Sequence, residues 1–169
     1  MEENFEISIL DKKEDMVCLE EFARKVWTEH YASIISFPQI EYMLHKYQTA
    51  QRISEDISEG GYTYYIVRHG SGIIGYCAVK PDGAEGLFLS KLYVEKDFRG
   101  RGISRRLIDM LSEVCKSKNC GYIWLTVNKG NVNSIEAYKK MGFKIIEEIV
   151  TDIGKGFVMD DYKMRLDIA

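Results

Sequence analysis

Residues 92–104 read LYVEKDFRGRGIS, an order that predicts a strand, a short turn and the start of a helix. The first turn of a helix presents unpaired N–H groups and a partial positive charge, and together these favour an anion. Gly100 and Gly102 carry no side chain, so an anion can approach their backbone closely. Arg99 and Arg101 add fork-shaped donors that suit phosphate. The segment is therefore a candidate phosphate loop.

The same loop has a purely structural interpretation, in which two glycines make a tight turn and the arginines face solvent. It lacks the third glycine of the dinucleotide fingerprint G-x-G-x-x-G, and it lacks the Gly-Lys-Ser/Thr ending of a Walker loop. The residues by themselves leave the choice between a phosphate loop and a tight turn open.

Apolar spacing on either side of this loop predicts an α/β (α+β layered) chain, because strands and helices follow one another in a mixed order. Strands are expected over residues 5–10, 62–68, 73–79, 87–94, 122–127, 144–152 and 157–167, with a turn over 81–86. Helices are expected from a cap at Asp11 to about Tyr31, from Pro38 onward, over 50–58, from 103 onward and over 133–141, with Gly142 ending the last.

Length, charge and cysteine content narrow the class of protein. The 169 residues contain no repeat or linker, so we expect a single domain over residues 1–169. The formal net charge of −3 argues against a dedicated nucleic-acid binder, despite four arginines between residues 99 and 106. No stretch predicts a membrane span or a signal peptide. The four cysteines form no C-x-x-C pair, which favours reduced thiols and a cytoplasmic location.

Two motifs resemble the GCN5-related N-acetyltransferase (GNAT) family. Residues 99–104 read RGRGIS and are similar to the family pattern Arg/Gln-x-x-Gly-x-Gly/Ala, with Ser104 at the last position. Residues 131–143 read NVNSIEAYKKMGF and are similar to N-x-x-A-x-x-x-Y-x-K-x-G-F, with Ser134 in place of alanine. Both motifs in this order and spacing are far more specific than either alone. The resemblance is close over residues 62–143 and looser in the N-terminal helices.

The resemblance implies a mixed, mostly antiparallel sheet of six to seven strands, flanked by helices and splayed between the fourth strand (87–94) and the fifth (122–127). It implies acetyl-CoA as co-substrate, with the pantetheine arm along the fourth strand and the pyrophosphate on residues 99–104, and no metal. The cofactor-binding residues implied in this way are Leu92, Tyr93, Val94, Arg99, Gly100, Arg101, Gly102, Ile103, Ser104, Asn131 and Asn133.

For catalysis, the resemblance implies that Tyr138 is the general acid toward the departing thiolate; the alternative is an aromatic residue of the core. Asn133 stands three residues before Glu136, so it is also expected to cap its helix. A base is needed as well, because an amine must lose its proton before it attacks. The candidates for this base by residue type alone are His30, His45, Glu85, Glu95 and Asp160.

The expected reaction is acetyl transfer to a primary amine of a small molecule by direct attack. Asp160 and Asp161 would suit a polyamine, since carboxylates attract a polycation. The aromatic and histidine side chains of the N-terminal helices are candidates for an acceptor pocket or for the core; they are Trp27, His30, Tyr31, Tyr42, His45 and Tyr47. A peptide or protein N-terminal acetyltransferase and a non-catalytic CoA-binding module stay open as alternatives. We expect no nucleic-acid or membrane partner, and a homodimer stays open.

Overall fold

The computed structural model describes residues 4–168. Within it the chain forms two compact units: the first comprises residues up to Lys80 together with Lys91–Ser104, and the second comprises Pro81–Ser90 and the residues from Arg105 onward. A single domain over residues 1–169 stays a prediction, and its residues 1–3 and 169 lie outside the described ones.

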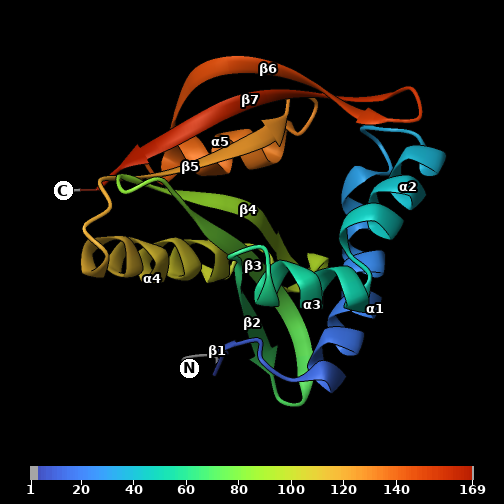
Figure 1. The fold of residues 1–169 in the computed structure, drawn as a ribbon, viewed down its shortest axis with the longest axis horizontal. Helices are drawn as coiled ribbons and strands as arrows, with labels where there is room; N and C mark the ends of the chain where they lie inside the picture. The colour runs from blue at the N-terminus through green and yellow to red at the C-terminus, as the bar shows by residue number, and fades with distance from the viewer. Residues whose placement is uncertain (1–3, 169) are drawn as a thin grey trace. The chain divides into compact units, whose positions relative to one another are not determined.

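The first unit holds three helices that follow one another along the chain, together with strands of the sheet (Figure 1). Its elements are β1 (Glu6–Ile9), α1 (Lys13–Tyr31), α2 (Phe37–Tyr47), α3 (Ala50–Ser58), β2 (Thr63–His69), most of β3 (Gly72–Asp82), the end of β4 (Gly86–Val94), the short 3₁₀ helix η1 (Lys96–Phe98) and the first residues of α4 (Ile103–Ser117). Strand β2 pairs antiparallel with both β1 and β3.

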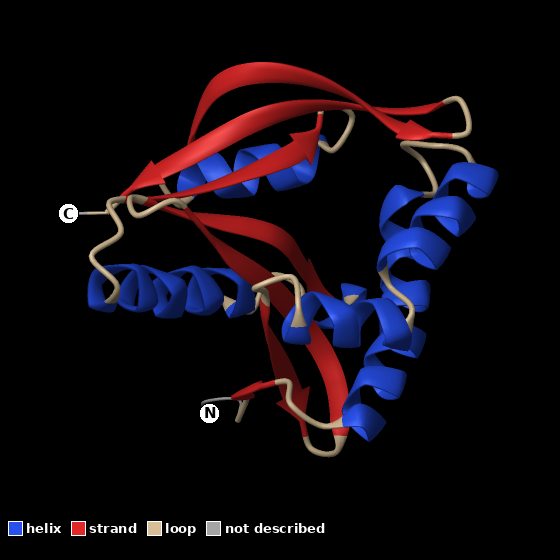
Figure 2. Ribbon diagram, viewed as in Figure 1, coloured by secondary structure: helices blue, strands red, loops and turns tan. Residues whose placement is uncertain are grey.

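The second unit is built around a long hairpin (Figure 2). Its elements are the start of β4, α4 from Arg105, β5 (Tyr122–Asn128), α5 (Val132–Lys140), β6 (Lys144–Gly154) and β7 (Phe157–Asp167). Strand β7 pairs antiparallel with β5 on one side and with β6 on the other. Its core includes Ile123 and Leu125 of β5 and Met164 of β7, because alternate residues of paired strands share one face.

The strands form one mixed, seven-stranded sheet in the order β1-β2-β3-β4-β5-β7-β6. The β4–β5 pair is parallel and covers three residue pairs, from Gly86 with Tyr122 to Phe88 with Trp124. This ladder is short beside the lengths of the two strands, as the predicted splay between them requires. The predicted fold class is therefore confirmed. Among the helices of residues 4–168, none is long and apolar enough to cross a membrane.

Two predicted boundaries are wrong. The first helix is not capped by Asp11: it begins at Lys13 after an extended Lys12, without a side-chain cap. Strand β3 runs on through Pro81 to Asp82, where a turn was expected. The β2–β3 ladder ends at Val79, so Pro81 lies beyond it. The N–H that a proline lacks therefore costs this ladder no hydrogen bond.

A buried chain of hydrogen bonds joins α1 to the sheet of the first unit. The Trp27 indole N–H donates to the Tyr76 hydroxyl over 2.8 Å, and that hydroxyl donates to Oε1 of Gln48 over 2.6 Å. All three side chains are at most 3% exposed. Because a buried polar group without a partner is costly, one hydroxyl satisfies both a donor on α1 and an acceptor after α2.

The Tyr76→Phe variant should be clearly less stable than the wild type. It leaves the Trp27 N–H and the Gln48 carbonyl oxygen without this partner, at a cost of about 1–3 kcal/mol for each buried group. Denaturant unfolding measures the loss. The matched control is Tyr65→Phe, which removes a hydroxyl of the neighbouring strand β2 that makes no hydrogen bond among the described residues. Equal unfolding free energies for the two variants would contradict the role given to Tyr76.

Candidate functional site

The loop between β4 and α4 has the backbone conformation that a phosphate site needs. Gly100 and Gly102 have φ angles of 77° and 80°, in the left-handed region that favours glycine. A Cβ added at either position would meet nothing within 4 Å. The backbone is therefore open beside the first residues of α4, where helix N–H groups are unpaired.

The side chains of this loop hold its two ends. Arg99 turns back toward the strand, and its Nε donates to the carbonyl oxygen of Val94 over 3.0 Å. The guanidinium carbon of Arg101 lies 4.9 Å from the centre of the Phe98 ring, a cation–π arrangement. Ile103 is buried and anchors the start of α4. Both arginines are exposed, so their charge is presented at the surface of the loop.

Of the predicted residues on β4, Tyr93 belongs to an aromatic cluster, defined as Trp27, His30, Tyr31, Tyr76 and Tyr93. The Tyr93 and Tyr31 hydroxyl oxygens are 2.8 Å apart and share a hydrogen bond. Val94 is buried, and Leu92 is half-buried. The structure thus joins the fourth strand to α1, and several aromatic residues of the N-terminal helices do pack in the core.

His30 differs from the other candidates for the base. Burial, with a smaller contribution from the Arg99 charge, lowers the pKa of His30 to about 4. Its imidazole is therefore neutral at physiological pH but only weakly basic.

The carboxylates and the second histidine are less distinctive. Glu95 is ion-paired with Lys25, and Asp160 is 3.0 Å from the Lys129 ammonium. Glu85 and His45 are exposed. The two ion-paired carboxylates already have cationic partners, so none of the five candidates is singled out as the base by its surroundings.

The remaining predicted residues lie on α5 and its cap, in the second unit. Asn131 is 8% exposed, and its side chain accepts a hydrogen bond from the Ser134 N–H over 3.3 Å. The expected cap at Asn133 is therefore wrong: Asn133 is an exposed residue inside the first turn, because the helix begins at Val132. Gly142 follows the helix with φ 103°, as predicted.

Tyr138 is half-buried near the end of α5. Its ring packs edge-on against Phe143 with 5.4 Å between centroids, and the Tyr138 carbonyl accepts the Phe143 N–H over 3.0 Å. Both contacts lie within the second motif, so this motif fixes the ring position by local packing.

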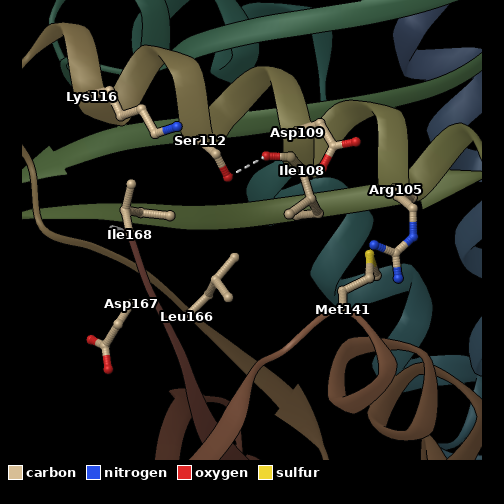
Figure 3. A pocket seen from close by; sticks show the side chains of 9 residues that line it. All are labelled: Arg105, Ile108, Asp109, Ser112, Lys116, Met141, Leu166, Asp167 and Ile168. Carbon is tan, nitrogen blue, oxygen red and sulfur yellow. Dashed lines mark hydrogen bonds between the residues drawn. The ribbon is translucent and has the colours of Figure 1, made fainter.

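Two pockets lie away from these residues. One, of about 230 Å³, is in the second unit between α4 and the end of the chain (Figure 3). The other, of about 370 Å³, is in the first unit between α1 and the β2–β3 turn. None of the predicted site residues lines either pocket, so neither pocket bears on those predictions.

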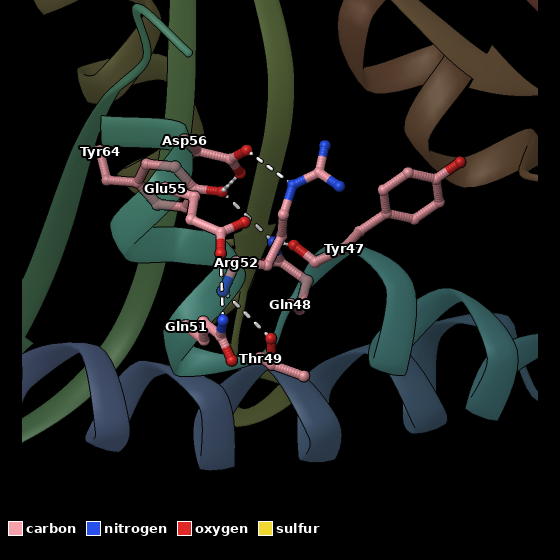
Figure 4. A network of polar contacts seen from close by, with 8 residues as sticks. All are labelled: Tyr47, Gln48, Thr49, Gln51, Arg52, Glu55, Asp56 and Tyr64. Carbon is pink, nitrogen blue, oxygen red and sulfur yellow. Dashed lines mark hydrogen bonds and ion pairs between the residues drawn. The ribbon is translucent and has the colours of Figure 1, made fainter. Parts of the chain in front are cut away.

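The sequence gave no indication of Lys91 of β4, whose ammonium group is influenced by Asp56 and Arg52 of α3. Figure 4 shows the polar network to which these two α3 residues belong. In that network the Tyr64 hydroxyl donates to Asp56 over 3.0 Å, and Arg52 pairs with the other carboxylate oxygen over 2.9 Å. Burial lowers the pKa of Lys91 to about 8, against a smaller opposing effect of Asp56. The Lys91 ammonium also lies over the rings of Tyr62 and Tyr64. No local sequence signal marks this site, because its residues meet only through the fold.

The sequence singled out Asp161 only jointly with Asp160, as a pair of carboxylates that would suit a polyamine. Asp161 is 7% exposed, and its Oδ1 has no hydrogen-bond partner among the described residues. Burial, followed by the charge of Asp160, raises its pKa to about 6. The only signal in the sequence is a carboxylate inside an apolar strand pattern.

Known proteins resemble this chain in sequence and in fold. Streptothricin acetyltransferase of Streptomyces lavendulae is 30% identical over 94 residues, which are 53% of this chain and 50% of the relative. Thialysine N-epsilon-acetyltransferase of Bos taurus is 28% identical over 83 residues, 49% of this chain and 47% of the relative. The chain thus spans about half the length of these curated relatives.

The crystal structure of PaiA N-acetyltransferase from Thermoplasma acidophilum, in complex with coenzyme A, has a TM-score of 0.82 and 24% sequence identity, with 97% of this chain and 99% of that one covered. This likeness confirms the fold. The model of the acetyltransferase (GNAT) family matches residues 20–143, which include both motifs. The chain therefore belongs to the acetyltransferase (GNAT) family.

Proposed function

We propose that this protein is an N-acetyltransferase that moves the acetyl group of acetyl-CoA to a primary amine of a small molecule. The observation that carries this proposal is the open left-handed turn at Gly100 and Gly102, directly before α4, in a chain of the GNAT family. The relatives named after streptothricin and thialysine, both small molecules, support a small-molecule acceptor. The neighbour that was crystallised with coenzyme A supports the choice of co-substrate.

The proposed role of residues 99–104 is to bind phosphate. The backbone N–H groups at the start of α4 would donate to the pyrophosphate, and the absence of Cβ atoms at the two glycines leaves room for it. Arg99 and Arg101 would add positive charge. Leu92, Tyr93 and Val94 would contact the pantetheine arm, and Asn131 and Asn133 would complete the cofactor contacts.

The proposed chemistry is direct attack of a neutral amine on the thioester carbonyl carbon. A C–N bond forms, the C–S bond breaks, the amine loses one proton, and the departing thiolate gains one. An alkyl ammonium with a pKa near 10.4 is about 0.04% neutral at pH 7, so desolvation or a base must help. Tyr138 is the proposed donor of the proton to the thiolate.

An amine panel tests this proposal directly. Purified protein, acetyl-CoA and each candidate amine are mixed, and free thiol is followed together with the acetylated amine. Small amines should be acetylated. Acetylation of peptide N-termini alone would replace the proposed acceptor class, and binding of coenzyme A without any transfer would indicate a non-catalytic module.

The proposed place of action is the cytoplasm, because three of the cysteines are buried free thiols, as is usual in a reducing compartment. Sedimentation of the purified protein measures whether it is a homodimer.

The Gly102→Val variant should bind acetyl-CoA at least about tenfold more weakly, or about 1.4 kcal/mol. A branched side chain disfavours the left-handed backbone and fills the space that the phosphate would take. Calorimetry measures the affinity. Gly70→Val is the matched control, since Gly70 has φ 64° and an equally open Cβ position in the β2–β3 turn. If both variants keep wild-type affinity, the loop is only a tight turn.

The Tyr138→Phe variant should lower kcat about 10²-fold with little change in cofactor affinity, because only the hydroxyl is lost and it acts as the C–S bond breaks. The ring and its packing on Phe143 remain. The measurement is steady-state kinetics with a confirmed acceptor, under conditions in which chemistry limits the rate. Tyr122→Phe serves as a control from the same unit. A Tyr138→Phe enzyme that keeps more than about a third of wild-type kcat would rule out the general-acid role.

A further inference from the structure

Asp161 of β7 is a buried carboxylate whose Oδ1 has no partner among the described residues. Buried polar groups in proteins are almost always hydrogen-bonded, and a buried charge without a partner is costly. The residue is 7% exposed, so bulk water does not offset this cost. An unsatisfied oxygen of this kind therefore calls for a donor that residues 4–168 do not supply.

Lys129, whose backbone N–H donates to the Asp160 carbonyl beside Asp161, has its ammonium group engaged elsewhere. Lys129 is 3.0 Å from Asp160 and 3.3 Å from Glu148, and it lies over the Tyr162 ring. Glu148 stands opposite Tyr162 in the β6–β7 ladder. Successive strand residues point to opposite faces, so Asp160 and Tyr162 share one face of β7 and Asp161 lies on the other. Lys129 thus neutralises the neighbouring carboxylate but not Asp161.

The described neighbours of Asp161 on its own face of β7 are poor candidates for a hydrogen-bond donor or a cation to pair with it. Its register partners are Asn128 on β5 and Ile149 on β6. The Asn128 side-chain oxygen accepts the Gly130 N–H over 2.8 Å, and Ile149 is apolar. Lys163, two residues further on the same face, holds its ammonium 4.4 Å from the centre of the Trp124 ring. Within residues 4–168, the ion pairs of this region join Lys129 to Glu148 and Asp160 and Arg165 to Asp167, and none of them involves Asp161.

We propose that Asp161 binds an ammonium group of the acceptor amine. An ammonium supplies both the missing positive charge and the missing N–H donor, and charge-assisted hydrogen bonds of this kind are strong. The inference rests on the proposed acetyltransferase function and names the chemical class of its acceptor.

The ammonium bound by Asp161 is not the one that reacts. A carboxylate stabilises the protonated form of the amine that it touches, whereas attack on the thioester requires the neutral form. A contact with the reacting nitrogen would therefore oppose the reaction. A contact with a second, non-reacting ammonium positions the substrate without this penalty. The acceptor is therefore a molecule with at least two amino groups, such as an aliphatic diamine or polyamine.

The test compares diamines with monoamines of the same chain length: putrescine with butylamine, and cadaverine with pentylamine. In the wild type, kcat/KM should be higher for the diamine of each pair. In Asp161→Asn, which keeps the side-chain shape but removes its charge, this preference should fall at least about tenfold, mostly through KM. Rates with the monoamines should change less than about threefold. Asp160→Asn is the matched control, because Asp160 lies on the opposite face and is paired with Lys129; its preference should stay as in the wild type.

Three results would overturn the inference. The first is an unchanged diamine preference in Asp161→Asn, which is expected if an ordered water hydrogen-bonds to the oxygen. The second is an equal loss of kcat with the diamine and the monoamine, which is expected of a general base. The third is the same loss of preference in Asp160→Asn. Calorimetric titration of cadaverine into the protein, in the presence of coenzyme A, provides a readout that needs no acetyl transfer. If the wild-type protein acetylates no amine but binds cadaverine through Asp161, the proposed acetyltransferase function is refuted and the proposed ammonium site is retained. Absence of cadaverine binding would refute the site.

Discussion

The left-handed backbone at Gly100 and Gly102 is the constraint on which the proposed site depends. It turns the chain from β4 into α4 within a few residues and leaves the first N–H groups of the helix uncovered. The turn is held at both ends, by the hydrogen bond from Arg99 to Val94 and by the burial of Ile103. A residue with a Cβ at either position would strain the left-handed backbone and also cover it. The turn and the proposed cofactor binding therefore both require glycine at these positions.

A buried polar network of the first unit contrasts with one buried carboxylate of the second. In the first unit, Trp27, Tyr76 and Gln48 satisfy one another, and this chain of hydrogen bonds fixes α1 against the sheet. In the second unit, Asp161 has a carboxylate oxygen that meets no partner within the described part of the chain. Satisfied networks specify a structure, whereas an unsatisfied buried charge reduces stability and persists where a ligand completes it. This contrast is why Asp161, and not the buried hydroxyls, points to a ligand.

Features that are set by neighbouring residues could be predicted from the sequence, whereas features that are set by contacts between distant segments could not. The strand, turn and helix around residues 99–104 and the glycine that follows α5 are set by neighbouring residues, and both were predictable. Asp11 and Asn133 are residue types that often cap helices, but α1 begins at Lys13 without a side-chain cap, and the cap of α5 is Asn131. The burial of Asp161 and the lowered pKa of Lys91 arise from contacts between strands and helices that are far apart in the sequence. The spacing of residues along the chain therefore does not predict them.

The central claim, that residues 100–104 bind the pyrophosphate of coenzyme A through their backbone, is tested most directly by nuclear magnetic resonance of the amide groups. Coenzyme A is titrated into uniformly labelled wild-type protein, and the N–H resonances of the chain are followed. The account predicts that the amides from Gly100 to Ser104 shift the most and become protected from exchange with solvent. Saturating coenzyme A that leaves these amides unshifted and unprotected would contradict it.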